Sequence, residues 1–275
     1  MLVGRTLLFV PGDRPDRIGK AIASDADAVA VDLEDAVAPQ AKAAARDAAL
    51  TAVRAAPPRK GLFLRVNPID GPEFDDDLAT LTALLPHLAG VLLPKAESAD
   101  QVRRLDELAG GAVAVVPIVE SARGVLDAPA IAAASPRVAT VVFGTLDLAA
   151  DLGVTPTVEG AELRNARAHV VLATAAAGLP GPLDGPHAAL DDTDGLVRAS
   201  VLARELGFTG KVVLHPRQLA PVQEAFAPTE EELARAREVV AASRESGGGA
   251  VRLADGTFVD VPVVRRAAAL LGMDA

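Results

Sequence analysis

Short apolar runs alternate with alanine-rich stretches of helical period along most of this chain. Such near-continuous apolar runs are typical of parallel strands that helices cover on both faces. We read strands at residues 6–10, 28–35, 61–67, 90–97, 112–120, 139–147, 181–187 and 211–218, with helices between them, for example at 40–55, 99–108, 159–177 and 194–206. This pattern predicts an α/β fold, a (β/α)8 TIM barrel.

An open, doubly wound parallel sheet is the structural alternative. It is disfavoured because no glycine-rich phosphate-binding turn, GxGxxG or GxxxxGK[ST], follows any of the runs. The length of 275 residues is ordinary for an α/β barrel. With no Trp or Tyr, the core must consist largely of Val, Leu, Ile and Ala, the residues that fill barrels.

The pattern changes at about Pro228. Residues 228–246 have acidic residues in the first turn and helical spacing, so they predict a helix. Asp255-Gly256 between two short β-type runs predicts a hairpin, and Pro262 marks the start of a last helix. We therefore expect a TIM-barrel catalytic domain at 1–227. The extension at 228–275 is too small to fold alone and should pack on the barrel or on a neighbouring subunit.

Charge and composition narrow the class of function. The formal net charge of −10 argues against nucleic-acid partners. The absence of cysteine excludes disulfides and thiolate-bound metals, so any metal must use carboxylate, His or carbonyl ligands. The first residues show neither a signal-peptide pattern nor an apolar stretch of membrane-spanning length. We expect a cytoplasmic enzyme without a membrane partner.

Charged and polar residues gather where the predicted strands end. The carboxyl ends of barrel strands meet at one rim, where active sites lie. The residues at these ends are Asp13, Arg14, Asp32, Glu34, Asp35, Arg65, Asn67, Lys95, Glu97, Glu120, Asp147, Asp184, His187 and His215.

Alternation along the second run indicates which of these side chains share a face. Its even-numbered residues place Asp32 and Glu34 together, whereas Asp35 points away and is expected to cap a helix. In the third run, Arg65 falls on the face that Phe63 also occupies. Arg65 and the two carboxylates can therefore face the barrel mouth.

Converging carboxylates repel one another and need a cation. Mg²⁺ or Mn²⁺ held by oxygen ligands is the natural candidate here. Glu120 and Asp147 end neighbouring predicted strands and form the best pair of ligands, although each could instead cap the helix that follows it. A divalent ion at this place could polarise a carbonyl or stabilise an enolate.

Seven motifs carry a family resemblance. They are RTLLFVPGDRPDR, AVDLEDAV, LRVN, VLLPKAES, PIVESARG, FGTLDLAADLG and GFTGKVVLHPRQL, in this order. Together they resemble the citrate lyase β-subunit-like group of the HpcH/HpaI aldolase family, from about Arg5 to the final helix. The resemblance implies a homotrimeric or hexameric TIM barrel. It also implies Mg²⁺-dependent cleavage or formation of a carbon–carbon bond in a 3-hydroxyacyl-CoA thioester such as citryl-, malyl- or citramalyl-CoA, with a 2-oxo acid as a further small-molecule partner.

The same resemblance suggests roles for the acidic residues. It makes Glu120 and Asp147 the protein ligands of Mg²⁺, and it places Glu120 against the substrate. Asp32, Glu34 and Asp35 are similar to the acidic cluster around the metal's waters.

Roles for four further residues follow from the resemblance. Arg65 is similar to the arginine that contacts substrate oxygens, although it could be a structural partner of the neighbouring carboxylates. Lys95 matches a lysine near the pocket, with an ion pair to Glu97 as the alternative. Arg14 is a candidate contact for the CoA phosphates. Asp260 matches an aspartate that acts in proton transfer at a neighbouring subunit's site, with capping of the last helix as the alternative.

Departures from the family pattern leave the substrate open. Leu146 replaces a glutamate that many relatives have, and the segment from 183 to 192 also differs from the expected forms. A carbon–carbon lyase is the favoured function. A hydroxyacyl-CoA thioesterase using the same metal site and a carrier-dependent citrate lyase β subunit remain alternatives.

Overall fold

The computed structural model describes residues 3–57, 61–157 and 160–273, so the expected helix start at residue 159 lies outside the described residues. The contacts divide the chain into two compact units, Met1–Phe226 and Ala227–Ala275. We describe each unit by itself.

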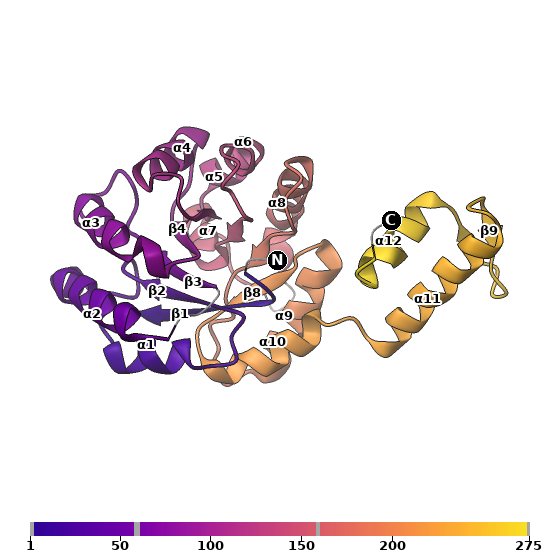
Figure 1. Cartoon of the computed structure of the whole chain (residues 1–275), viewed down its shortest axis with the longest axis horizontal. Coiled ribbons are helices and arrows are strands. Elements are labelled where there is room, and N and C mark those ends of the chain that lie inside the picture. Colours follow the sequence, from indigo (N-terminus) through magenta and orange to yellow (C-terminus); the bar gives the residue numbers. More distant parts are fainter. Residues whose placement is uncertain (1–2, 58–60, 158–159, 274–275) are drawn as a thin grey trace. The chain divides into compact units, whose positions relative to one another are not determined.

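The first unit is a closed parallel barrel (Figure 1). Each strand pairs with the next in the chain, and β8 pairs with β1, which closes the ring and excludes the open-sheet alternative. The strands are β1 (Thr6–Pro11), β2 (Ala28–Asp32), β3 (Leu62–Arg65), β4 (Gly90–Leu93), β5 (Ala114–Val119), β6 (Val142–Phe143), β7 (Leu183–Asp184) and β8 (Gly210–Val213). The predicted (β/α)8 barrel is confirmed.

Helices connect the strands and cover the outside of the barrel. They are α1 (Pro15–Ile22), α2 (Lys42–Ala55), α3 (Phe74–Leu84), α4 (Ala99–Leu108), α5 (Ala122–Leu126), α6 (Ala128–Ala132), α7 (Thr145–Leu152), α8 (Arg164–Ala176), α9 (Thr193–Leu206) and α10 (Leu219–Phe226). Short 3-10 turns lie at η1 (Pro39–Ala41), η2 (Leu85–His87), η3 (Ala161–Leu163) and η4 (Pro216–Gln218).

Local capping fixes where several helices begin. Ser98 and Gln101 form a reciprocal capping box at the start of α4, with the Gln101 N–H donating to Ser98 Oγ at 3.3 Å. The Asp192 carboxylate accepts the Gly195 N–H at 2.9 Å at the start of α9. These caps satisfy backbone donors that a helix leaves unpaired at its first turn.

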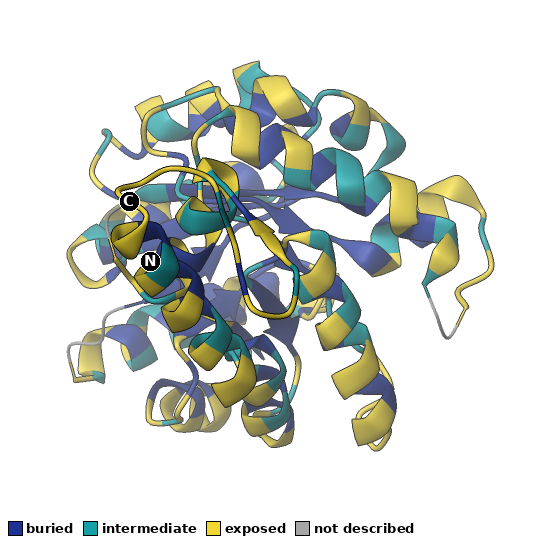
Figure 2. Cartoon of the chain, turned by 90° about the vertical axis from the view of Figure 1, so that its right-hand side faces the viewer, coloured by how far each residue is buried: buried dark blue, intermediate teal, exposed yellow. Residues whose placement is uncertain are grey.

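The barrel core has two apolar layers, as period-two alternation predicts. Ala28, Ala30 and Phe63 belong to the cluster inside the barrel, together with residues of most other strands. Val29 and Val31 face the opposite way and pack in the larger cluster between strands and helices. Figure 2 shows buried strands surrounded by helices whose outer faces are exposed. Side chains that continue the inner face of each strand therefore emerge at the barrel mouth.

The second unit contains the expected helix, hairpin and helix. They are α11 (Glu230–Glu245), the antiparallel pair β9 (Val251–Arg252) and β10 (Phe258–Val259), and α12 (Val261–Leu270). A small apolar cluster of its own joins them, which includes Val239 and Val259. Packing of this unit on the barrel or on a neighbouring subunit stays a prediction. Within the described residues, no helix combines the length and apolar character needed to cross a membrane.

Candidate active site

Asp32 and Arg65 meet at the ends of two neighbouring strands. The pairing of β2 with β3 places the two residues directly opposite each other. Arg65 Nε donates to Asp32 Oδ1 at 2.7 Å, and Arg65 Nη2 donates to Asp32 Oδ2 at 2.5 Å. Both side chains are buried. This bidentate pair confirms that the two side chains share the inner face and gives the guanidinium a fixed orientation.

Arg65 also approaches a second carboxylate. Its Nη1 lies 2.8 Å from Glu34 Oε2 in an ion pair that lacks the alignment of a hydrogen bond. Its guanidinium carbon stands 4.8 Å from the centre of the Phe9 ring. Burial opposes the charge on Arg65, but the neighbouring carboxylates outweigh it and raise the pKa of Arg65. Arg65 is therefore a permanent cation at the barrel mouth.

Lys95 pairs with the other oxygen of Glu34. Its ammonium pairs with Glu34 Oε1 and lies 3.2 Å from Asp35 Oδ2. Burial opposes the charge on Lys95, yet Glu34 and Asp35 raise the pKa of Lys95. The expected alternative of an ion pair with Glu97 is wrong, since Glu97 Oε1 instead accepts the Ser121 hydroxyl at 2.6 Å. The side chain of Asp35 turns toward Lys95 and caps no helix in the described part of the chain.

Glu120 follows the last residue of β5 and continues its inner face. Only 4% of its surface is exposed. Its Oε1 accepts the backbone N–H of Lys95 at 2.8 Å. Ser121, rather than Glu120, caps α5, because the Ser121 hydroxyl accepts the Gly124 N–H at 3.1 Å. The helix-cap interpretation of Glu120 is therefore wrong, and the carboxylate remains turned toward the barrel mouth.

Gly144 leaves the space that the Glu120 side chain fills. A Cβ atom at Gly144 would lie 2.4 Å from Glu120 Cβ and 2.5 Å from Glu120 Oε2. Contacts this short do not occur between real side chains, so any larger residue at this position would displace the carboxylate. Gly144 is thus a steric requirement for the observed position of Glu120.

Asp147 lies in the first turn of α7, and Gly144 rather than Asp147 is the N-cap residue of that helix. The Asp147 carboxylate is half-buried and close enough to Glu120 to influence its titration. Burial, followed by the charge of Asp147, raises the pKa of Glu120 to about 8. The Lys95 N–H and Arg65 oppose this rise only in part. Burial and mutual repulsion therefore disfavour simultaneous ionisation of Glu120 and Asp147, and a bound cation would relieve this cost.

This site fits a divalent cation with oxygen ligands. The acidic groups are Asp32, Glu34, Asp35, Glu120 and Asp147, whereas the nearby cations are Arg65 and Lys95. Among the described residues, no hydrogen bond reaches the second oxygen of Glu120, and no group of three or more His, Asp or Glu side chains is arranged to hold a metal by itself. Mg²⁺ suits this donor set because it commonly takes one or two carboxylates and completes its octahedron with water and substrate oxygens.

Two further predicted site residues form other contacts in the structure. Arg14 is exposed at the start of α1, where its Nε lies 3.7 Å from Asp13 Oδ1. Asp260 belongs to the second compact unit and caps α12, accepting the Val263 N–H at 3.5 Å. The capping alternative for Asp260 is therefore confirmed within this chain. Its action at a neighbouring subunit stays a prediction.

Lys42 holds the loop that carries Glu34, a role that the sequence did not indicate. Its ammonium donates to the carbonyl oxygens of Leu33 and Glu34 at 2.7 and 2.8 Å, and to Asn67 Oδ1 at 2.7 Å. Asn67 is in turn held by Asp77, whose Oδ2 accepts the Asn67 N–H at 2.6 Å. These contacts fix the loop that carries Glu34. Lys42 lies at the start of a helix, where a lysine is ordinarily a solvated residue, so no local signal marks its role.

A parallel barrel with an acidic centre at the carboxyl ends of its strands defines an enzyme of the TIM-barrel class. The family model described as HpcH/HpaI aldolase/citrate lyase matches residues 5–216. This chain belongs to that family.

Relatives of this chain align with it over nearly the whole length of both chains. A citrate lyase subunit beta-like protein of Deinococcus radiodurans is 39% identical over 282 residues, covering 98% of this chain and 97% of the relative. The L-malyl-CoA/beta-methylmalyl-CoA lyase of Cereibacter sphaeroides is 32% identical, covering 96% and 92%. The crystal structure of CitE from Mycobacterium tuberculosis with magnesium, acetoacetate and coenzyme A has a TM-score of 0.85 and 38% identity, covering 98% and 97%. The chain is therefore a lyase of the citrate lyase β-like type.

Proposed function

We propose that this protein is an Mg²⁺-dependent carbon–carbon lyase that acts on a 3-hydroxyacyl-CoA thioester such as citryl-, malyl- or citramalyl-CoA. The observation that carries the proposal is the buried Glu120 beside Asp147, with the pKa of Glu120 raised to about 8. The magnesium and coenzyme A bound to the similar CitE protein support it, as does the malyl-CoA lyase activity named for the Cereibacter relative.

Glu120 and Asp147 would hold Mg²⁺ in this proposal. When bound, the ion supplies Lewis-acid polarisation of a substrate oxygen. Asp32, Glu34 and Asp35 surround the site. Ion pairs with Arg65 and Lys95 reduce the repulsion among these three carboxylates. The chain thus supplies a rigid, oxygen-rich cradle whose geometry is set before the substrate arrives.

Arg65 would stabilise negative charge on the reacting oxygens. Three of its nitrogens already face Asp32 and Glu34, and a guanidinium carries five N–H donors. The donors left over can reach a substrate oxygen while the two carboxylates keep the group oriented. In this proposal Lys95 borders the same substrate-binding pocket through its half-buried ammonium.

The remaining assignments concern Asp260 and Arg14. Asp260 would transfer a proton at the site of a neighbouring subunit, within the homotrimer or hexamer that the family resemblance implies. Arg14 would receive the CoA phosphates from its exposed position at the start of α1. Both assignments rest on the family resemblance and are tested by substitution of each residue.

The experiment is a screen of citryl-, malyl- and citramalyl-CoA with the purified chain, with both products identified by mass. A lyase releases a shorter acyl-CoA and an oxo acid, and its activity disappears when EDTA removes the metal. Free CoA with an intact hydroxy acid would instead indicate the thioesterase alternative. Activity that appears only after addition of a carrier protein would indicate the carrier-dependent β subunit.

A further inference from the structure

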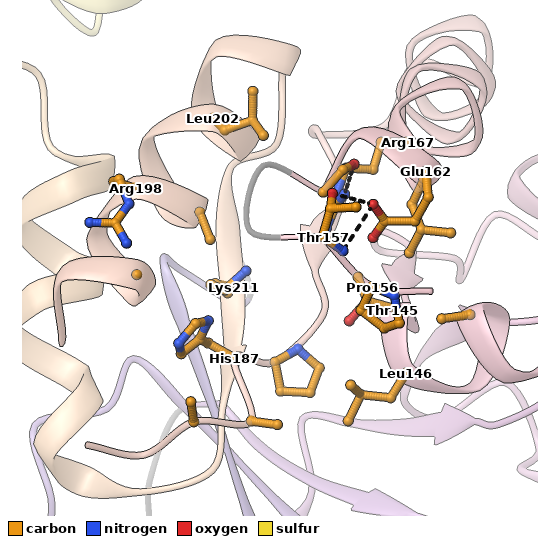
Figure 3. A pocket seen from close by; sticks show the side chains of 18 of the residues that line it. Thr145, Leu146, Pro156, Thr157, Glu162, Arg167, His187, Arg198, Leu202 and Lys211 are labelled. Carbon is orange, nitrogen blue, oxygen red and sulfur yellow. Dashed lines mark hydrogen bonds between the residues drawn. The ribbon is translucent and has the colours of Figure 1, made fainter. Parts of the chain in front are cut away.

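A hollow lies beside the first turn of α7. It is a cavity of about 660 Å³, lined by the segment that begins α7, by α8 and by α9 (Figure 3). Thr145 and Leu146 line it, whereas Asp147, the next residue in the chain, faces the acidic centre. A volume of this size is typical of cavities that hold small molecules.

Two buried cations, Arg167 and Lys211, form the floor of the cavity. Lys211 Nζ lies 2.5 Å from Asp184 Oδ2, and Arg167 Nε lies 3.0 Å from Asp184 Oδ1. Burial opposes ionisation of Asp184, but the two cations outweigh it and lower the pKa of Asp184. The single negative charge of Asp184 therefore balances only one of these two positive charges, so this part of the floor has a net positive charge.

Two arginines line the cavity without a hydrogen-bonded partner. Neither Arg164 nor Arg198 forms a hydrogen bond or an ion pair with any residue in the ranges that the structure describes. Both are exposed, and Figure 3 shows Arg198 on the side of the cavity opposite Arg167. In a chain of net charge −10, a cavity lined by more cations than acids is a local reversal of the overall charge.

The acidic residues of the lining are already engaged. Glu162 Oε2 accepts the Thr157 hydroxyl at 2.6 Å. Asp192 accepts the Gly195 N–H at 2.9 Å and lies 3.4 Å from His187 Nε2. The Gly195 N–H and, more weakly, the charges of His187 and Arg198 lower the pKa of Asp192. Within the described ranges, neither carboxylate forms a hydrogen bond or an ion pair with Arg164 or Arg198, so the N–H donors of these arginines are available to an added anion.

The walls are apolar and include one unsatisfied hydroxyl. Leu146, Leu163 and Leu202 line the cavity. Thr145 is 8% exposed, and its Oγ1 is buried without a hydrogen-bond partner among the described residues. Because this Oγ1 atom is covered, the walls present mainly apolar surface to a ligand.

We propose that this cavity binds a small organic anion whose aliphatic body lies against the leucines and whose carboxylate or phosphate is held by Arg164 and Arg198. Arginine suits both groups because its planar N–H donors match two oxygens at once. The proposal is independent of the lyase chemistry, because none of these residues contacts Glu120 or Asp147 through a described interaction and no metal is required for binding.

The test is isothermal titration calorimetry with glutarate and n-butyl phosphate, in EDTA, using the full chain. Saturable binding of at least one probe is expected, with 1-butanol failing to bind. In the double variant Arg164→Ala, Arg198→Ala the affinity should fall at least about tenfold, the loss expected from one charge-assisted contact. Arg137→Ala removes the same charge from an exposed site elsewhere on the barrel and should leave the affinity unchanged.

The outcomes separate this proposal from the proposed function. Binding that persists in Glu120→Gln supports a site distinct from the metal centre, even if no CoA ester is turned over. Preference for glutarate identifies a carboxylate ligand, and preference for butyl phosphate identifies a phosphate ester. Failure of both probes to bind, or equal binding by the double variant and the wild type, overturns the proposal.

Discussion

The backbone N–H of Lys95 donates to Glu120 Oε1 at 2.8 Å, so the turn after β4 orients the carboxylate that follows β5. Lys95 has a φ of 49°, and it is the one residue other than glycine with a positive φ in the described part of the chain. The same residue pairs its ammonium with Glu34. The strained turn thus positions the Lys95 N–H against Glu120 and the Lys95 ammonium against Glu34. Backbone strain of this kind is concentrated at functional sites.

The left-handed turn at Lys95 gives a test that is independent of charge. Lys95→Gly and Lys95→Ala both remove the ammonium, but only alanine keeps a Cβ atom at a φ of 49°. Glycine should therefore be the more stable variant by about 1 kcal/mol, the reverse of the usual order. Urea unfolding measures the difference. Alanine being equally or more stable would show that the turn is not strained.

Gly144 should tolerate no side chain. In Gly144→Ala the new Cβ would meet Glu120 at 2.4 Å, so the carboxylate must move while the barrel stays folded. Turnover should fall at least about tenfold, as expected when a reacting group is displaced by a fraction of an ångström or more. Gly19→Ala is the matched control, because nothing lies within 4 Å of its new Cβ. Circular dichroism establishes that both variants fold, and full activity of Gly144→Ala would contradict the prediction.

The raised pKa of Glu120 should appear in the pH dependence of stability. Its folded-state pKa of about 8 exceeds the ordinary value of 4.5, so the folded chain keeps a proton that the unfolded chain releases between these values. The free energy of unfolding should therefore fall as the pH rises from about 5 to 8, with a slope of at most about 1.4 kcal/mol per pH unit from this one group.

Glu120→Gln should abolish this group's contribution to the fall in the free energy of unfolding, because a neutral amide does not titrate. In EDTA, the variant should gain stability relative to the wild type between about pH 5 and pH 8, by a few kcal/mol at most. Urea unfolding at both pH values gives the difference. A difference that stays constant with pH would show that Glu120 titrates normally.

The buried ion pairs of Asp184 with Arg167 and Lys211 should contribute more to the free energy of unfolding than an exposed ion pair does. Lys211→Met removes one of the two cations that face Asp184 and should lower the free energy of unfolding by about 3 kcal/mol. Arg217→Ala removes an exposed pair with Asp191 and should cost less than about 1 kcal/mol. Denaturant unfolding compares the two, and similar losses in both would contradict the prediction.

The sequence predicts the barrel and the strand face on which the site residues lie, because both depend on the spacing of apolar residues along short segments. Alternation along β2 and β3 placed Asp32 beside Arg65, and the structure confirms it. Alternation failed for Asp35, because β2 ends at Asp32 and the loop beyond it does not keep a period of two.

Other parts of the site depend on contacts between distant segments. Lys95 pairs with Glu34 across the barrel mouth rather than with nearby Glu97, because the turn after β4 directs its side chain there. Lys42 reaches two backbone carbonyls of a neighbouring loop, which no spacing in the sequence reveals. Tertiary geometry, not residue pattern, decides these partners.

The role of the acidic pair is tested most directly by turnover of a hydroxyacyl-CoA ester as Mg²⁺ is added to EDTA-treated protein. The wild type should recover activity with Mg²⁺ and release a shorter acyl-CoA and an oxo acid. The double variant Glu120→Ala, Asp147→Ala should remain inactive at every Mg²⁺ concentration while keeping its fold. Full activity of that double variant would contradict the assignment of Glu120 and Asp147 as the magnesium ligands.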